Sequence, residues 1–408
     1  MQFANLRIEN WRQFKSIDIA FHKRLTIVTG TNGAGKTTIL NTLSRALGWQ
    51  IHMLFSNYED REIRKNWHGD GESEFDFSVE PAGHISFDDG TVMDLNIPRS
   101  GAVLQTFGAL RGADGVYITS HRPFFSYSPV NDIPTQVGDA HRILNEYTNR
   151  SKRIFQPVQT QEVIKASQNP SHKLKETLIA AATFGEGNST VAPDESLKEI
   201  FDGFGEIMRF LLPDEIGFQR LMVRIPEIYV VSKSGVFPLE STSGGMSAII
   251  DLAWQIFLAS KAFHNFVVLI DEPENHLHPA LQKRLLNDLV RAFPKVQFIV
   301  ATHSPLMITS VEDSVVYALR PNEDRTISGQ EIDFFNKSAS ATETLDRVLG
   351  VDGSTPQWAS RKLNEIVERY LPRLDEPNVL QEMKNVLIEE GLSGDFTKVI
   401  SKLSERKE

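Results

Sequence analysis

The sequence predicts an α/β fold in which a mixed N-terminal β region leads into a parallel sheet core, with a helical insertion and a helical C-terminal segment. The runs RLTIVT (24–29), FVVLI (266–270) and VQFIVAT (296–302) are apolar nearly throughout, as in strands buried on both faces of a parallel sheet. Stretches of helical periodicity alternate with such runs in the second half of the chain. A glycine-rich turn, GTNGAGKTT (30–38), follows the first run and precedes a helix.

The composition restricts the possible function classes. The 408 residues carry a net charge of −10 and contain no cysteine. This charge argues against a chain coated in nucleic acid, although a local basic groove remains compatible with it. The lack of cysteine excludes disulfides, zinc–thiolate sites and thiol catalysis. The N-terminus lacks the apolar segment of a secretory signal, and no apolar run reaches the roughly 18–20 residues of a membrane helix. We therefore expect a cytoplasmic protein with no membrane partner.

The N-terminal half should be rich in strands. A helix is expected over residues 36–47, ending at Gly48, because glycine readily adopts the left-handed conformation that stops a helix. The strands expected in this half are 2–9, 16–21, 24–29, 75–79, 84–87, 92–97 and 115–120. From residue 121 to about 215, Pro, Gln, Ser and Asn become frequent and helical periodicity replaces strands. This stretch is predicted to be an inserted helical lobe.

The second half is more regular. A β-hairpin is expected over 224–239, with Ser234 and Gly235 at its turn. Helices are expected at 246–263 and 279–293, and two or three more within 356–408. The strands expected here are 266–270, 296–302 and 314–319. These elements suggest four parts: two halves of one head (1–120 and 216–335), the insertion (121–215) and a C-terminal segment (336–408).

The turn at 30–38 has the pattern of a phosphate-binding loop. Gly30, Gly35, Lys36 and Thr37 fit G-x-x-x-x-G-K-[ST]. Backbone N–H groups of such a loop and the following helix N-terminus favour anionic oxygens. Lys36 would neutralise the β- and γ-phosphates, and Thr37 would bind Mg²⁺. The residues expected around the phosphates are Gly30, Asn32, Gly33, Ala34, Gly35, Lys36, Thr37 and Thr38. The alternative is a plain glycine turn between a strand and a helix.

A second apolar strand ends in two acids, in the stretch FVVLIDEPENHLHP (266–279). Asp271, at the strand tip, is placed to hold Mg²⁺, and Glu272 to polarise an attacking water. Solvated acids at a strand end are the alternative, but Mg·nucleotide chemistry requires a second carboxylate of this kind. His276 and His278 suggest metal binding, although two histidines at this spacing are more often found in a turn.

Four motifs in this order resemble those of an ABC-type P-loop ATPase head, of the branch that contains the SMC, RecF and OLD proteins. GTNGAGKT resembles the Walker A motif, STSGGMS (241–247) the ABC signature, VVLIDEPENHLHP the Walker B motif with its catalytic glutamate and D-loop, and VATHSP (300–305) the switch strand. The opening RIENWRQF (7–14) resembles the N-F-R-x-F start of this branch, with Trp11 where Phe is usual. This last resemblance suggests that Arg12 lies near the nucleotide.

The resemblance implies a role for each matched residue, with ATP and Mg²⁺ as ligands. Lys36, Thr37 and Thr38 contact phosphates and Mg²⁺, Asp271 supports Mg²⁺, Glu272 is the general base, and His303 reaches the γ-phosphate. Ser243, Gly244 and Gly245 would cap the γ-phosphate bound to a second copy, so that ATP joins a homodimer or a higher homo-oligomer. The signature-like motif departs from the usual one at Thr242 and Met246. A flexible linker at 241–247 and an ordinary strand-end histidine at 303 are the alternatives.

Two features remain open. YITSHRPF (117–124) stands where a glutamine loop is expected, so His121 and Arg122 are candidates for phosphate contact. Residues 140–175 contain seven basic and two acidic residues, with Tyr147 and Phe155 among them, which predicts a DNA or RNA contact or a solvated, partner-facing surface.

No D-x-D pair follows residue 335, so we expect no Toprim nuclease of the kind that many OLD proteins carry. Nuclease-free heads resemble ATPases of the Septu and PARIS anti-phage systems, which implies a separately encoded effector. A RecF- or SMC-like ATPase of DNA repair or maintenance is the main alternative. A transporter subunit and a pseudo-ATPase that only binds are disfavoured, the latter by the intact Lys36, Asp271 and Glu272.

Overall fold

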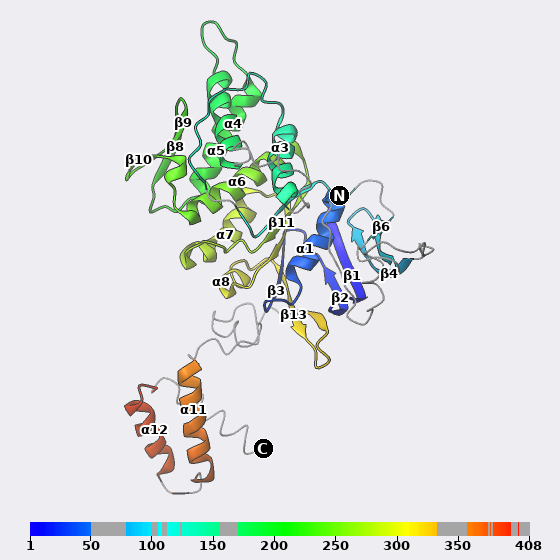
Figure 1. Cartoon of the computed structure of the whole chain (residues 1–408), viewed down its shortest axis with the longest axis vertical. Helices are drawn as coiled ribbons and strands as arrows, with labels where there is room; N and C mark the ends of the chain where they lie inside the picture. The colour runs from blue at the N-terminus through cyan, green and yellow to red at the C-terminus, as the bar shows by residue number, and fades with distance from the viewer. Residues whose placement is uncertain are drawn as a thin grey trace, which may run out of the picture. The chain divides into compact units, whose positions relative to one another are not determined.

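The computed structural model describes residues 1–49, 79–98, 105–107, 112–122, 125–154, 170–332, 357–373, 376, 378–392 and 399. The chain divides into two compact units, Met1–Thr344 and Leu345–Glu408 (Figure 1). The larger unit contains an 11-stranded sheet and a separate three-stranded sheet.

One half of the large sheet is parallel. Its strands lie in the order β13 (Val315–Pro321), β3 (Leu25–Gly30), β12 (Val296–Ala301), β11 (Phe266–Asp271) and β7 (Gly115–Ile118). Every residue of β3, β11 and β12 is buried, which explains why these runs are apolar nearly throughout. The sequence order β3, β11, β12 differs from the spatial order, because β12 inserts between the other two.

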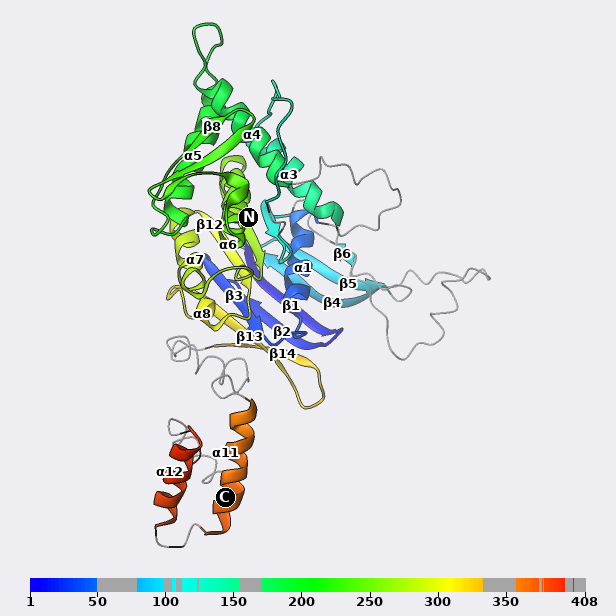
Figure 2. The same ribbon diagram turned by 60° about the vertical axis from the view of Figure 1, so that its left-hand side comes forward.

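The other half of the sheet is mainly antiparallel. It contains β6 (Gln105–Phe107), β5 (Val92–Pro98), β4 (Val79–Phe87), β1 (Phe3–Trp11) and β2 (Phe14–Ala20), in that order. Strand β14 (Ile327–Glu331) joins the halves, since it pairs parallel with β2 and antiparallel with β13 (Figure 2). The predicted mixed β region and parallel core are therefore confirmed as parts of one continuous sheet.

Helix α1 (Lys36–Ser44) packs between the two halves. It contacts β3, β11 and β12. Its Leu40 and Leu43 belong to one apolar core that also contains Ile8 of the antiparallel strands and Val267 of the parallel ones. A 3₁₀ turn, η1 (Arg45–Leu47), completes the helix and ends at Gly48, whose φ is 78°. The predicted stop at Gly48 is confirmed.

Helix α6 (Gly244–Ala262) is buried around its whole circumference from residue 247 to 259. It packs on β7 and β11 and is covered by α3 (Ala140–Ile154) and α5 (Glu195–Leu211). Helix α4 (Pro170–Gly185) packs against α5. Figure 1 shows these three covering helices gathered beside α6, away from β1 and β2. They confirm the predicted helical insertion.

A three-stranded sheet precedes α6. It has the order β10 (Gly235–Pro238), β9 (Glu227–Ser232), β8 (Phe218–Arg224), and a 3₁₀ turn, η4 (Leu239–Ser241), links it to the helix. The predicted hairpin is confirmed as β9 and β10, but its turn is formed by Lys233 and Ser234, and Gly235 is the first residue of β10. Strand β8 was not expected, because most of its residues are only partly buried or exposed and its apolar pattern is weak. Strands β6 and β14 were also unexpected, since both are short and β14 is largely polar.

The remaining helices of this unit follow the parallel strands. They are α7 (Pro279–Ala292), after β11, and α8 (Pro305–Ile308), after β12. The expected strand at 75–79 lies outside the described residues except for Val79, where β4 begins.

The smaller unit has its own apolar core. It contains α11 (Gln357–Tyr370), a 3₁₀ turn η5 (Leu371–Arg373) and α12 (Val379–Glu389). Leu363, Val367, Met383 and Leu387 are buried together in it. These helices confirm the expected helical C-terminal segment. Among the described residues, no helix has both the length and the apolar character needed to cross a bilayer.

Candidate nucleotide-binding site

The glycine-rich loop lies between β3 and α1. Gly35 is the N-cap of α1 and has φ of 95°, a conformation that side chains other than glycine rarely adopt. A Cβ atom at this position would come within 2.5 Å of Phe14 Cζ and 2.7 Å of Gln13 Nε2. Both the backbone conformation and the packing therefore favour glycine at position 35. The close approach of Gly35 to Phe14 and Gln13 places the loop against the turn between β1 and β2.

Lys36 is buried in this loop, with 6% of its surface exposed. Its Nζ donates hydrogen bonds to the carbonyl oxygens of Gly30 (2.9 Å) and Thr31 (3.1 Å), so the ammonium group lies along the loop. Burial lowers the pKa of Lys36, and the charges of Glu272 and Asp271 oppose this effect. The first N–H groups of α1 have no acceptor within the helix, by helix geometry. An ammonium and free N–H groups at a helix start fit a bound phosphate.

Thr37 and Asp271 meet at the start of α1. The Thr37 hydroxyl donates a 2.9 Å hydrogen bond to Oδ2 of Asp271, while Oδ1 of Asp271 is buried without a hydrogen-bond partner. Burial, which is the largest cause, and the charge of Glu272 together raise the pKa of Asp271 to about 6, although the hydrogen bond from Thr37 and the charge of Lys36 oppose the shift. Mg²⁺ prefers oxygen ligands, including carboxylates and hydroxyls. An unpartnered carboxylate oxygen beside a threonine hydroxyl therefore fits a divalent cation.

Glu272 follows Asp271 at the end of β11 and adopts φ of 46°, which is rare for a residue with a side chain. Its N–H donates to the Ala301 carbonyl at 2.8 Å. Asn275 Nδ2 donates to Oε2 at 3.1 Å, and His303 Nδ1 lies 3.5 Å from Oε1. The side chain is 28% exposed. The carboxylate is thus held in place yet accessible to water, as a general base must be.

His303 lies just beyond the end of β12, between the strands that lead to the loop and to Glu272. A buried residue that the sequence analysis missed, Glu274, holds this position. Its Oε1 accepts hydrogen bonds from Thr302 Oγ1 (2.6 Å) and the His303 N–H (2.9 Å), and lies 3.3 Å from His303 Nδ1. In the sequence, the only sign of this role is that Glu274 is the second glutamate of DEPE (271–274). The turn after β11 brings its side chain to the end of the neighbouring strand β12.

The signature-like turn begins α6. Ser243 is the N-cap, and its Oγ accepts from the N–H of Met246 at 3.4 Å, so the helix starts at Gly244, two residues before the predicted position. Ser243 is exposed. A Cβ atom on Gly245 would lie 2.9 Å from the His276 carbonyl oxygen. The turn after β11 therefore packs directly on the start of α6, and the flexible-linker alternative is wrong.

His276 and His278 lie in and just after the turn that follows Glu272. His278 is the N-cap of α7, where its Nδ1 accepts from the N–H of Ala280 at 3.3 Å, and His276 has φ of 69°. Within the described part of the chain, no group of three or more His, Asp or Glu side chains is placed to hold a metal ion. Both histidines have structural positions in this turn.

The remaining candidates differ in their surroundings. Arg12 lies in the turn between β1 and β2, next to Gln13, which contacts the loop. The guanidinium carbon of Arg12 lies 5.3 Å from the Trp11 ring centroid. Burial lowers the pKa of Arg12. His121 is exposed and pairs with Ser120. Arg122 is buried and bonds backbone carbonyls after β11. In this structure, Arg122 is therefore directed at the segment that holds Glu272.

The basic stretch 140–175 is described only in part. Its described cations all form ion pairs: Arg142 with Glu146, Lys173 with Glu146 and Glu176, and Lys175 with Glu227 and Glu240. Tyr147 is buried and donates to Asp251. The side chains of Arg150, Lys152, Arg153, Phe155 and Lys165 lie outside the described set.

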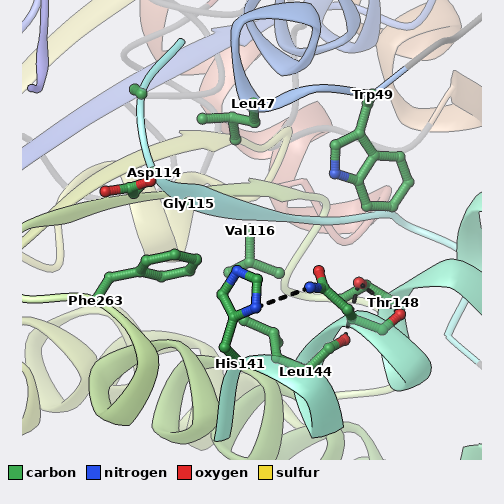
Figure 3. A pocket seen from close by; sticks show the side chains of 11 residues that line it. Leu47, Trp49, Asp114, Gly115, Val116, His141, Leu144, Thr148 and Phe263 are labelled. Carbon is green, nitrogen blue, oxygen red and sulfur yellow. Dashed lines mark hydrogen bonds between the residues drawn. The ribbon is translucent and has the colours of Figure 1, made fainter. Parts of the chain in front are cut away.

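A cavity of about 190 Å³ lies elsewhere, between η1, β7, α3 and the end of α6 (Figure 3). His141 pairs with Asn145 at 3.1 Å beside it, and Trp49 and Phe263 form apolar walls. None of the residues predicted to bind nucleotide or Mg²⁺ lines this cavity, whereas His141, Leu144, Asn145 and Thr148 of the basic stretch do. It is therefore separate from the proposed nucleotide site.

The loop, His303 and the Asp271–Glu272 pair lie at the carboxyl ends of three adjacent parallel strands, β3, β12 and β11. With the signature-like helix start, this arrangement matches the fold of an ABC-type P-loop ATPase head, similar to those of the SMC/RecF/OLD-like branch.

Comparisons with known proteins found similarities to ATPase family models, to proteins of known name and to a solved structure. A family model described as "AAA domain" matches residues 5–202, and one described as "AAA domain, putative AbiEii toxin, Type IV TA system" matches residues 127–309. The Septu protein PtuA of Bacillus mycoides is 31% identical, over 51% of this chain, and the match spans only 30% of that relative. The Retron Ec83 probable ATPase of Escherichia coli is 22% identical, over 96% of this chain and 81% of its own length. The SMC head domain from Thermotoga maritima is 15% identical, with a TM-score of 0.44, over 82% of this chain and all of that chain.

Proposed function

We propose that the chain binds and hydrolyses ATP at a composite site formed by two copies arranged head to tail. The observation that carries this proposal is that Lys36 and Thr37, after β3, lie close to Asp271 and Glu272, at the end of the parallel strand β11. Lys36 and the N–H groups of the loop would hold the β- and γ-phosphates, assisted by Asn32, Gly33, Ala34 and Thr38. Arg12, next to Gln13 at the loop, is proposed to approach the nucleotide.

Thr37 and Asp271 are the residues that would hold Mg²⁺. When bound, the ion supplies charge neutralisation at the β- and γ-phosphates. Glu272 would orient a water molecule and accept its proton as the water oxygen bonds to the γ-phosphorus and the bond to the β-phosphate oxygen breaks. His303, held by Glu274, would donate a hydrogen bond to the γ-phosphate. These roles use side chains that hydrogen bonds hold at the ends of three neighbouring strands.

The second half of the site would come from another copy. Ser243 is exposed at the start of the 19-residue helix α6, and Gly244 and Gly245 follow without side chains that would shield the N–H groups. Such a helix start favours an anion. The close packing of Gly245 on the turn after Glu272 supports a shared interface, because both segments would face the partner together.

ATP turnover and oligomeric state test this proposal together. Glu272→Gln should lower kcat by about 100-fold or more and should accumulate an ATP-bound dimer, because binding is kept while the base is lost. Ser243→Arg should leave ATP binding by a single copy intact and should abolish the ATP-dependent dimer. Light scattering after size exclusion, with and without ATP, measures the dimer. Unchanged turnover in Glu272→Gln, or an unchanged dimer in Ser243→Arg, would contradict the assigned roles.

We further propose that the chain is the regulatory ATPase of a bacterial anti-phage defence system and controls a separately encoded effector, such as a nuclease. The support is its similarity to relatives named as a Septu protein and a retron ATPase. Co-expression with the product of the adjacent gene should give a complex that survives purification. A chain that purifies alone, with no change in turnover or assembly when that product is added, would argue against this role.

The second candidate is a RecF- or SMC-like ATPase that binds DNA. The excess of basic residues in 140–175 supports it, although Arg142, Lys173 and Lys175 are engaged in ion pairs. DNA-stimulated hydrolysis that disappears on charge reversal at Arg150, Lys152 and Arg153 would favour this candidate. An absence of DNA binding at low salt, where phosphate contacts are strongest, would exclude it.

A further inference from the structure

Arg122 is a buried cation directly behind the strand end that carries Glu272. Only 7% of its surface is exposed. Its NH2 group donates hydrogen bonds to the carbonyl oxygens of Glu272 (3.0 Å) and Pro273 (3.3 Å). The guanidinium therefore bonds the backbone of the turn, and it does so at the residue proposed to be the general base.

The backbone of Glu272 needs such support. Its φ of 46° lies in the left-handed region, which is unfavourable for a residue with a Cβ atom. The following Pro273 disfavours the right-handed helical region for Glu272, so the extended region is the main competitor. A change to the extended region would rotate the Glu272 carbonyl away from Arg122. The N–H of Glu272 donates a hydrogen bond to the Ala301 carbonyl, and the Glu272 carbonyl accepts one from Arg122. Both backbone polar groups of Glu272 are therefore held.

Charges around Arg122 explain why a guanidinium can be buried there. Burial lowers the pKa of Arg122, and Asp251, Glu274, Asp271 and Glu272 oppose this effect, with Asp251 first among them. Asp251 is itself buried on α6, where it accepts hydrogen bonds from Tyr147 (2.5 Å) and Gln255 (2.9 Å). Helix α6 thus supplies a buried carboxylate whose charge favours the charged form of Arg122.

We propose that Arg122 is a positioning residue for hydrolysis, which holds Glu272 in its left-handed conformation through the backbone carbonyl and does not contact phosphate. This inference rests on the proposed function, because it assumes that Glu272 is the base. Arg122 orients the Glu272 carboxylate without touching the reacting atoms. Its contribution is therefore to the rate of the chemical step, and nucleotide binding should depend on it weakly.

Arg122→Met tests this assignment, since methionine retains the apolar length and removes the donors. We expect kcat to fall by about 10- to 100-fold, as for other small displacements of a catalytic group. The dissociation constant for a non-hydrolysable ATP analogue should stay within about 3-fold of wild type. In a Glu272→Gln background the same substitution should cause no further loss of turnover, because the group that it positions is already absent.

Arg24→Met is a matched control. The Arg24 guanidinium also bonds backbone carbonyls, those of Val290, Phe293, Pro294 and Val296, but at the turn between α7 and β12. Its substitution should lower the melting temperature and leave kcat unchanged. If Arg122→Met does not fold, Arg122→Lys keeps the charge and one donor group, and should show an intermediate kcat with unchanged analogue affinity.

The possible results are distinguishable. A folded Arg122 variant with wild-type kcat overturns the inference, as does a variant that weakens analogue binding while kcat is retained, because that result indicates a phosphate contact. A further loss in the Glu272→Gln background overturns the route through Glu272. A wild-type protein that does not hydrolyse ATP refutes the proposed function, and the inference with it.

Discussion

The hydroxyl group of Thr37 donates a 2.9 Å hydrogen bond to Oδ2 of Asp271, although 234 residues separate the two in the sequence. The bond joins the first turn of α1 to the end of β11, across the intervening strand β12. Because Oδ1 of the same carboxylate is buried without a partner, the pair has the oxygen atoms that a divalent cation would need.

Asp271→Asn should raise the free energy of unfolding of the nucleotide-free protein at pH 7.5 and leave it nearly unchanged at pH 4. Burial raises the pKa of Asp271 from 3.8 to about 6. Between these values the folded protein keeps a proton that the unfolded chain has released, so stability falls as pH rises from 3.8 through 6. The difference between the two pKa values corresponds to a change of at most about 3 kcal/mol in the free energy of unfolding. Urea unfolding at both pH values measures it, and equal effects at both would argue against an ionised, unpaired Asp271.

Mixing two inactive variants should restore activity if the site is shared between copies. Lys36→Met lacks the loop function and Ser243→Arg lacks the signature function, so neither alone can form a complete site. In a mixed dimer, one site combines the intact loop of one copy with the intact turn of the other. Because neither variant alone should form the dimer that ATP holds, only mixed pairs assemble, and each carries one of two sites, so turnover should approach at most about half of the wild-type value. Turnover that stays at the level of the separate variants would indicate a site contained in one chain.

Gly35→Ala should greatly weaken nucleotide binding, because a Cβ atom would meet Phe14 and Gln13 and the backbone would need a left-handed alanine. Gly48→Ala is the matched control. Its φ of 78° is also left-handed, but no atom lies within 4 Å of the added Cβ. It should lower stability by about 1 kcal/mol and leave nucleotide affinity intact. Titration with a fluorescent ATP analogue separates the two, and equal losses of affinity would show that the Phe14 contact is irrelevant.

Lys175→Met should lower the free energy of unfolding by about 3–5 kcal/mol, the usual range when one partner of a buried ion pair is removed. Lys175 is fully buried, bonds Glu227, Glu240 and the Ser128 carbonyl, and connects α4 to the segment before Ser243. Adding Glu227→Gln and Glu240→Gln should recover part of the loss, because the unpaired charges disappear. Lys198→Met, which removes an exposed pair with Glu186, should leave stability nearly unchanged. A small effect at Lys175 would mean that water or the neighbouring backbone compensates the two glutamates.

Much of the fold could be predicted because its signals are local. The runs of β3, β11 and β12 are apolar since both faces are buried, and Gly48 ends its helix because it can adopt a left-handed conformation. Strands β8 and β14 escaped prediction because they are half-exposed or polar, so the alternation of apolar and polar residues that marks a strand is weak in both. The division of the chain at residues 120, 215 and 335 stays a prediction.

By itself, the sequence determined which residues are the candidates for the chemistry: the loop at Lys36 and Thr37, the acids at 271 and 272, and the serine–glycine turn at 243–245. Their types and spacing along the chain indicate phosphate and cation binding, and these are local properties. Only the tertiary structure decided that β12 separates the two strands of the site and that Glu274 holds His303. It also decided that Arg122 donates hydrogen bonds to the backbone carbonyls of Glu272 and Pro273. The physical reason is that strand order and the pairing of buried charges depend on contacts between segments far apart in sequence, which no local pattern records.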